Sequence, residues 1–519
     1  MENRMFEKLR SLARFGGKAS EHPLADPREL RRIIEEIPAD NAFRALDEII
    51  VWLESLRSAA DFPADRQYEA VSRLDDAAQP SLRRLTRDYL HSTRLASAEE
   101  KRLWSLNHRF WNLLAASYER CLPAPGPKTR AGEQLKQVLP ALCARLIAAL
   151  GAVYKWEQFH YGPSAGTLWQ RLGAAMRLAE AGGVASRALR LRENAPGLTS
   201  PQQEFVRIVA LQAASLDSLL PLEIELTERL IAHFASAFYF SPVAEHDCVY
   251  WVDLAQAVPP TRLARMPALA EPTLRFFKPA AAHAGIAGLL NDTEQGRDMP
   301  AAINLGGQYP ARTLLPVLRH LAAYLAPVPP QRRHDRHTVK QRVLVAPGLA
   351  NACKAFSGEL ATPGGGGQLE SWIVENVSRG GFGAVLNDVP GEWLKVGALV
   401  GIQPQGGASW LLAIVRRYHR QGESEALVGI ETLALHAEPV DLKTRAASSY
   451  AAVAGIPALL LREGSVAGEL RVVLPFATFD LRETLQYAQG GRRFELSPVA
   501  LVEQYGDYEL ARYRLGEIA

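Results

Sequence analysis

A change in hydrophobic period constrains the fold of this chain more than any other feature, and it falls at the proline-rich segment 326–330 (Ala-Pro-Val-Pro-Pro). Before this segment, apolar residues recur mostly at helical spacing. After it, short apolar runs separated by Gly, Pro and Asn are typical of β-strands. Helices and sheets bury their apolar faces in different layer arrangements, so we expect separate cores on the two sides. The 519 residues are enough for about three or four domains at ~150 residues each.

The first part, residues 1–244, is predicted to be an all-helical domain. Asp26-Pro27 and Ser200-Pro201 each place a good N-cap residue before a proline at the first helical position. Ser97 and Glu100 have the spacing of a capping box. We find no fixed repeat period, so the successive helices predict a bundle or a solenoid-like stack without regular repeats.

The remaining chain is predicted to be a small mixed α/β segment followed by β-structure. Residues 245–325 contain candidate strands and then a helix from Arg312 to about Leu325, and we expect this segment to pack on the helical domain. Residues 326–342 form a basic linker, 331–440 a small antiparallel β-barrel, and 450–519 a C-terminal β-rich module. The barrel strands are expected at 342–345, 355–359, 371–377, 382–386, 399–403, 410–418 and 427–432. The expected fold class is therefore multi-domain α+β.

Composition narrows the function classes. The 59 Lys/Arg and 56 Asp/Glu residues give a net charge of +3, which makes a general nucleic-acid-binding protein unlikely. We see no signal peptide and no run long enough to cross a membrane, and the four cysteines include no CxxC pair. We predict a cytoplasmic protein without a membrane span. No catalytic constellation stands out, so we expect no enzyme activity, no metal site and no cofactor.

A basic segment follows the linker. Residues 331–342 carry five Lys or Arg and one Asp, and Arg332 and Arg336 are spaced RxxxR, with Arg333 between them. A charge run alone is usually a solvated linker. The planar guanidinium group, however, binds phosphate and the O6/N7 edge of guanine through two parallel hydrogen bonds. Two arginines at this spacing could therefore hold one ligand between them.

A second polar motif lies downstream. Asn376, Ser378 and Gly381 are spaced NxSxxG. Residues i and i+2 of a strand project from one face, so the amide and the hydroxyl are available to the same ligand. Glycine leaves room for a close approach of ligand or backbone, or supplies a positive φ angle.

The two motifs together resemble the PilZ domain family, whose members bind cyclic di-GMP with RxxxR followed by (D/N)xSxxG. The resemblance covers roughly residues 331–435, and Ala413–Arg417 and Val428–Glu431 also look like barrel strands of this family. It implies a six-stranded antiparallel barrel. It also implies cyclic di-GMP as the ligand, held by Arg332, Arg336, Asn376, Ser378 and Gly381, with Arg333 as a helper. The spacing from Arg336 to Asn376 is wider than usual, which we attribute to an insertion at 362–368.

This resemblance predicts a cytosolic bacterial receptor for cyclic di-GMP. The receptor would relay binding of the dinucleotide to the helical region, where an unidentified protein partner binds. An alternative is an interaction scaffold whose degenerate PilZ-like barrel binds no nucleotide. A third interpretation makes the helical region an enzyme regulated by the barrel, which requires a pocket with converging polar residues there.

Overall fold

A computed structural model describes residues 22–91, 96–122, 130–164, 166–193, 195, 197–265, 267, 269, 271–328, 330, 335–361, 369–389, 391, 393–444 and 455–518. The chain divides into two compact units. The first comprises Met1–His160, Ser164–Leu216 and Pro221–Pro330, and the second comprises Tyr161–Pro163, Asp217–Leu220 and Gln331–Ala519. The predicted insertion at 362–368 lies outside the described residues.

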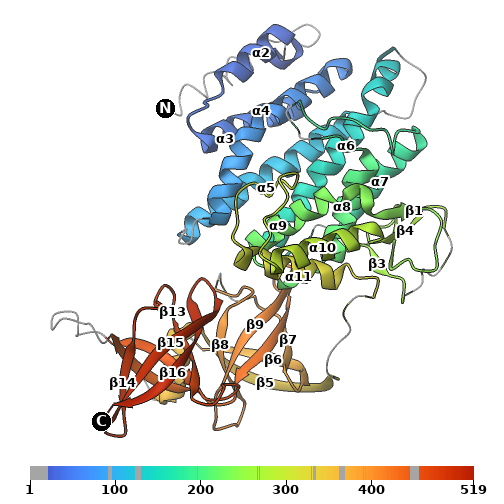
Figure 1. Ribbon diagram of the computed structural model, residues 1–519. Helices are drawn as coiled ribbons and strands as arrows, with labels where there is room; N and C mark the ends of the chain where they lie inside the picture. Colours follow the sequence, from blue (N-terminus) through green and yellow to red (C-terminus); the bar gives the residue numbers. More distant parts are fainter. Residues whose placement is uncertain are drawn as a thin grey trace. The chain divides into compact units, whose positions relative to one another are not determined.

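Helices dominate the first unit (Figure 1). They are α2 (Pro27–Glu36), α3 (Ala42–Ser58), α4 (Ala64–His91), α5 (Ser97–Arg120), α6 (Arg130–Phe159), α7 (Leu168–Ala181), α8 (Pro201–Ala213), α9 (Pro221–His233), α10 (Ala281–Glu294) and α11 (Ala311–Tyr324). A small antiparallel sheet has the strand order β1-β4-β2-β3, with β1 (Tyr239–Ser241), β2 (Tyr250–Asp253), β3 (Thr261–Arg262) and β4 (Leu274–Lys278). The predicted helical region and mixed segment are therefore both present. Two details differ: β1 lies inside residues 1–244, which were predicted to be all-helical, and α10 was not predicted.

Three helix N-termini can be compared with the predicted capping residues. The Asp26 side chain accepts a hydrogen bond from the Arg28 N–H, and the Ser200 hydroxyl accepts one from the Gln203 N–H, so both predicted N-caps are confirmed. The predicted capping box is wrong. Helix α5 already includes Ser97, its N-cap is Ala96, and no side chain caps it. Spacing alone did not show that the helix begins one residue earlier.

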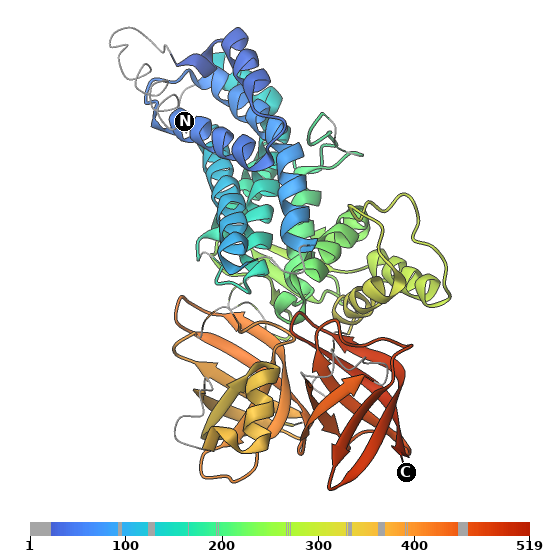
Figure 2. The same ribbon diagram turned by 90° about the vertical axis from the view of Figure 1, so that its left-hand side faces the viewer.

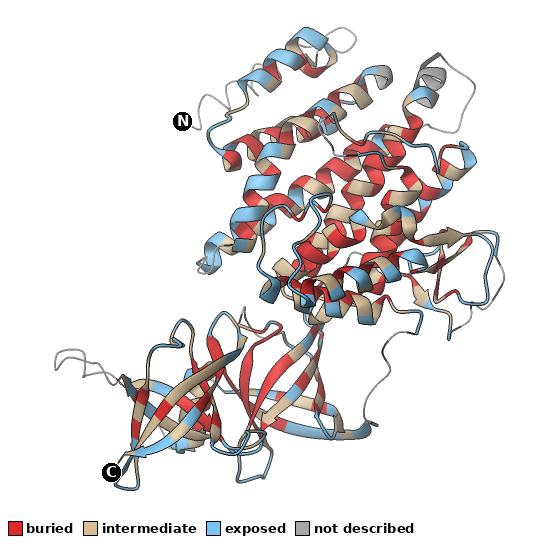
Figure 3. Ribbon diagram, viewed as in Figure 1, coloured by how far each residue is buried: buried red, intermediate tan, exposed pale blue. Residues whose placement is uncertain are grey.

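Helix α6 lies at the centre of the first unit and contacts α4, α5, α7, α8 and α9. Among the described residues, it is one helix whose length and composition would allow it to cross a membrane, with a mean hydropathy of 1.6 over Gln137–Phe159. Of this window, 67% is buried inside the protein, and Figure 3 shows buried residues along the facing sides of the helices. This degree of burial is typical of a helix in the core of a helical domain.

The second unit contains two closed, six-stranded antiparallel barrels, which lie side by side (Figure 2). The first has the order β10-β7-β6-β5-β8-β9. Its strands are β5 (His337–Pro347), β6 (Glu370–Ser378), β7 (Gly381–Leu386), β8 (Leu399–Pro404), β9 (Leu411–Arg420) and β10 (Ala426–Ala434). The second has the order β11-β12-β13-β16-β15-β14. Its strands are β11 (Glu438–Thr444), β12 (Ile456–Leu461), β13 (Glu469–Pro475), β14 (Leu485–Gln489), β15 (Arg492–Gln504) and β16 (Tyr508–Ile518).

Two details of the β-region differ from the sequence predictions. Residues 355–359, predicted as a strand, instead end helix α12 (Gly348–Ser357) and begin the 3-10 turn η4 (Glu359–Ala361). The helix buries Leu349, Ala352 and Ala355, which are spaced for one helical face, and it ends at Gly358 with φ 82°. Strand β11 was not predicted, and it belongs to the second barrel although it begins before residue 440.

Candidate ligand-binding site

The NxSxxG motif forms the hairpin between β6 and β7. Ser378 is the last residue of β6, Gly381 is the first of β7, and the two are paired across the hairpin. The Ser378 hydroxyl donates a hydrogen bond of 3.2 Å to the Gly381 carbonyl oxygen. The motif residues therefore stabilise a tight turn in addition to offering polar groups.

A β-bulge decides which way the motif side chains face. Val374 is buried in the barrel core, and Val377 packs against the same core. Both can face inward only because the pairing with β7 shifts register between Val374 and Asn376. Asn376 and Ser378, on either side of Val377, consequently lie on the outer face, where both are half-buried.

Two glycines allow close contacts at this site. A Cβ atom on Gly381 would lie 1.9 Å from the Ile430 carbonyl oxygen of β10. A Cβ atom on Gly383 would lie 2.6 Å from both the nitrogen and the oxygen of the Asn376 amide. The bare backbone of Gly383, which pairs with Asn376, thus leaves space for this amide. Gly383 was not predicted, although its i+2 spacing from Gly381 places both glycines on one face.

The basic segment enters the barrel next to this hairpin. His337 and Thr338, the first residues of β5, pair with Val377 and Asn376 of β6. Continuing this antiparallel ladder by one residue places Arg336, which is exposed, opposite Ser378. Arg332 and Arg333 lie outside the described residues. The structure therefore brings one of the three predicted arginines to the end of β6 that carries the polar motif.

The first unit contains a cavity of about 680 Å³ with charged walls. The Lys155 ammonium group lies 2.7 Å from Glu225, and Arg207 pairs with Glu228. Burial alone would raise the pKa of Glu228, but Lys155, Arg207 and Arg229 lower this pKa to about 2. The nearby cations therefore favour the ionised form of Glu228, which is suited to ion pairing.

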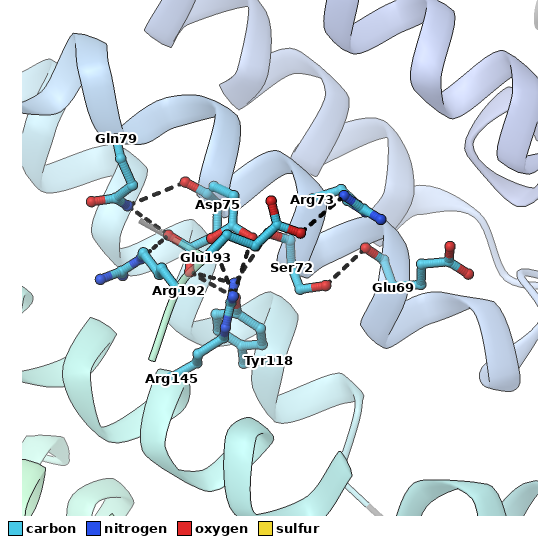
Figure 4. A network of polar contacts seen from close by, with 10 residues as sticks. Glu69, Ser72, Arg73, Asp75, Gln79, Tyr118, Arg145, Arg192 and Glu193 are labelled. Atoms are coloured by element: carbon cyan, nitrogen blue, oxygen red, sulfur yellow. Dashed lines mark hydrogen bonds and ion pairs between the residues drawn. The ribbon is translucent and has the colours of Figure 1, made fainter. Parts of the chain in front are cut away.

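A buried polar network ties helices of the first unit together (Figure 4). The Asp75 side chain on α4 is completely buried and accepts hydrogen bonds from four donors. These are the Tyr118 hydroxyl at 2.8 Å, the Gln79 amide at 2.7 Å, Arg192 Nε at 3.1 Å and Arg145 Nη1 at 3.3 Å. The network joins α4, α5, α6 and the segment after α7, and its members were not predicted because they are far apart in sequence.

A small closed barrel of six antiparallel strands, with an NxSxxG hairpin on its outer face, defines the first β-domain as a PilZ domain. Residues 368–439 match the family model of the middle PilZ domain of the cyclic-di-GMP receptor FimW. The chain therefore belongs to the PilZ domain family in this part. Residues 28–244 match the N-terminal domain model of the same receptor, which extends the relationship into the helical region, where no motif had indicated it. No curated protein matches the chain.

Proposed function

We propose that the protein is a cyclic di-GMP receptor that binds the dinucleotide at the β5–β6–β7 end of the PilZ barrel. One observation supports this proposal: His337, the residue after Arg336, pairs with Val377 at the end of β6, where Ser378 and Gly381 form their hairpin. The two family matches name domains of a cyclic-di-GMP receptor. The ligand residues are Arg332, Arg336, Asn376, Ser378 and Gly381, with Arg333 assisting.

Each group has a distinct chemical role in this proposal. Arginine guanidinium groups bind the phosphates and the O6/N7 edges of the guanine bases, where two parallel hydrogen bonds are geometrically possible. The Asn376 amide and the Ser378 hydroxyl, both on the outer face, supply neutral donors and acceptors. The receptor acts without catalysis, in the cytoplasm, and its helical region binds a protein partner.

The site is tested by titrating the full-length chain with cyclic di-GMP in a calorimeter. Arg336→Ala is expected to weaken the affinity about 10- to 150-fold, because a charge-assisted hydrogen-bonded contact contributes about 1.5–3 kcal/mol. Arg336→Lys should not restore binding, since an ammonium group cannot match a planar two-acceptor edge. Asn376→Ala and Ser378→Ala should weaken binding with melting temperatures close to wild type.

The matched control is Arg482→Ala, which removes an exposed arginine from the second barrel and should leave the affinity unchanged. Wild-type affinity in Arg336→Ala would refute the proposed site. If the wild-type chain itself releases no heat at high ligand concentration, the receptor function fails, and a scaffold with a silent barrel takes its place.

We further propose that ligand binding is relayed to the helical region through the linker 326–342. The linker was predicted to extend to residue 342, but residues 337–342 already belong to β5, which pairs with β6. Ligand binding would therefore fix the part of the linker before β5, and this change would alter how the two units are arranged. The free energy available is limited to the difference in ligand affinity between the two arrangements.

Hydrogen exchange and small-angle scattering, each measured with and without cyclic di-GMP, test this relay. We expect slower amide exchange over 326–336, the part of the linker before β5, and a different scattering curve in the bound state. Equal exchange rates and superimposable curves in a sample shown by calorimetry to be saturated would contradict the relay while leaving ligand binding intact.

A further inference from the structure

The two barrels have the same strand connectivity. In the first barrel, numbering the strands from β5 as one to β10 as six, the closed order is 1-2-3-6-5-4. In the second barrel, numbered from β11 to β16, the closed order is also 1-2-3-6-5-4. All twelve strand pairings are antiparallel. The second barrel thus has the strand order of a PilZ barrel, and β12 is the equivalent of the motif strand β6.

The second barrel lacks the polar groups of the motif. At the end of β6, the outward-facing residues are Asn376 and Ser378, whereas at the end of β12 the corresponding positions are Leu459 and Leu461. Three residues, Leu435-His436-Ala437, connect β10 to β11, and they include no arginine. Neither half of the nucleotide motif is therefore present at the equivalent positions.

The face of β12 that would carry a ligand is instead packed against the first barrel. Ala458 and Leu460 point into the second barrel, while Leu459 and Leu461 belong to an apolar cluster shared by both barrels. The first barrel contributes to this cluster the outer faces of β8 and β9 and one side of α12. These residues are Leu349, Ala352, Leu399, Leu412 and Ile414. A continuous buried apolar cluster holds the two barrels as one fixed pair.

A group of hydrogen-bonded side chains, which we call the polar clamp, also joins the two barrels. It comprises Arg416, Glu431, Glu503 and Tyr505. Arg416 on β9 donates hydrogen bonds of 3.0 and 2.9 Å to the two carboxylate oxygens of Glu503 on β15. The same guanidinium group donates to the Tyr505 hydroxyl at 2.6 Å and to Glu431 on β10. Bidentate arginine–carboxylate pairs in a network contribute more than isolated surface pairs.

The ring of Tyr505 also holds the two barrels together, because it packs closely against the first barrel. Its ring lies against Gly397, where a Cβ atom would be only 2.1 Å from the ring, and Gly397 has φ 85°. Only glycine both adopts this backbone conformation easily and leaves room for the ring. The turn between β15 and β16 is therefore seated against the first barrel by packing as well as by charge.

The clamp reaches the ligand hairpin through β10. Glu431, which accepts from Arg416, pairs directly with Gly381 of the NxSxxG motif. The next residue, Thr432, donates its N–H to the Gly380 carbonyl oxygen at 3.1 Å. Displacement of β10 would therefore move the turn that carries Ser378 and Gly381.

We propose that the C-terminal barrel is a second PilZ-type barrel that has no nucleotide site and positions the ligand hairpin of the first. The face of β12 that corresponds to the ligand face of β6 packs against the first barrel. Glu503 and Tyr505 hold Arg416, and Arg416 in turn holds Glu431 and the β7–β10 ladder in the binding geometry. Arg416, Glu503 and Tyr505 are positioning residues that act through the hairpin and do not contact the ligand. This inference rests on the proposed function only for its effect on cyclic di-GMP affinity.

The test compares Glu503→Gln and Tyr505→Phe with Glu517→Gln in the full-length chain. Glu517 is an exposed residue of β16 whose pairing with Arg492, at 3.6 Å, lies within the second barrel. Amide exchange without ligand reports on the hairpin itself, and calorimetry with cyclic di-GMP reports on binding. We expect Glu503→Gln to accelerate exchange at residues 379–383 and 431–432. We also expect about 2- to 30-fold weaker affinity, with little change in melting temperature. Glu503→Asp should restore most of both, and Glu517→Gln should change neither.

The outcomes separate the two proposals. Unchanged exchange at residues 379–383 in both Glu503→Gln and Tyr505→Phe overturns the positioning role. Faster exchange with wild-type affinity also overturns it, because the hairpin then does not control binding. If exchange accelerates but no protein, wild type included, binds cyclic di-GMP, the proposed function fails while the second barrel's hold on the hairpin is supported. A second binding event that persists in Arg336→Ala would refute the absence of a nucleotide site in the second barrel.

Discussion

Replacing Gly381 by alanine is expected to remove cyclic di-GMP binding and to destabilise the PilZ barrel by about 3 kcal/mol or more. The new methyl group would lie 1.9 Å from the Ile430 carbonyl oxygen, which belongs to the backbone of the paired strand. No side-chain rotation can relieve this contact, so β7 and β10 must separate. Loss of binding should therefore accompany a lower melting temperature, unlike in Ser378→Ala.

Gly422→Ala is the matched control for this substitution. Gly422 lies between β9 and β10, and a Cβ atom there meets no other atom within 4 Å. Thermal unfolding and calorimetric titration of both variants check the prediction. A Gly381→Ala protein with wild-type stability and affinity would show that the two strands do not approach as closely as described.

Replacing Asp75 by alanine is expected to lower the free energy of unfolding of the helical unit by about 3–5 kcal/mol, the usual cost of removing one partner from a buried ion pair. The side chains of Arg145 and Arg192 are 8% and 17% exposed and would each lose a carboxylate partner. Burial also raises the pKa of Tyr118, so its hydroxyl remains a neutral donor and would be left without its Asp75 acceptor.

Glu193→Ala provides the control in the same region. Its carboxylate is 73% exposed and lies 3.5 Å from Arg73, and exposed pairs of this kind contribute about 0–1 kcal/mol. Denaturant unfolding followed by circular dichroism, which reports on the helices, measures both variants. A loss below about 1 kcal/mol in Asp75→Ala would mean that the two arginines find other partners or water.

The PilZ assignment depended on short-range features of the sequence. RxxxR and NxSxxG each lie within a few consecutive residues, and the strand-type apolar alternation around them is also local. The family match at 368–439 and the six-stranded barrel agree with this prediction. By contrast, Gly383 was missed because its importance depends on a side chain seven residues earlier, which crosses it only after the hairpin has formed.

Residues 355–359 were predicted to form a strand, because their short-range apolar pattern does not distinguish a strand from a helix. A short apolar run of this kind fits a strand or a buried helix, and only its packing distinguishes them. In the structure these residues end α12, because Leu349 and Ala352 of this helix bury against the outer faces of β8 and β9 and against the second barrel.

The sequence by itself determined the helical and β-rich halves, two helix caps and the PilZ motif, because periodicity, capping and motif spacing depend on neighbouring residues. The tertiary structure alone decided three further points. It brought the start of β5, which follows Arg336, to the end of β6 through strand register, turned Asn376 outward through a bulge, and joined Glu503 to Arg416 across 87 residues. These contacts arise when distant strands pair and barrels pack, and no local pattern encodes that partner choice.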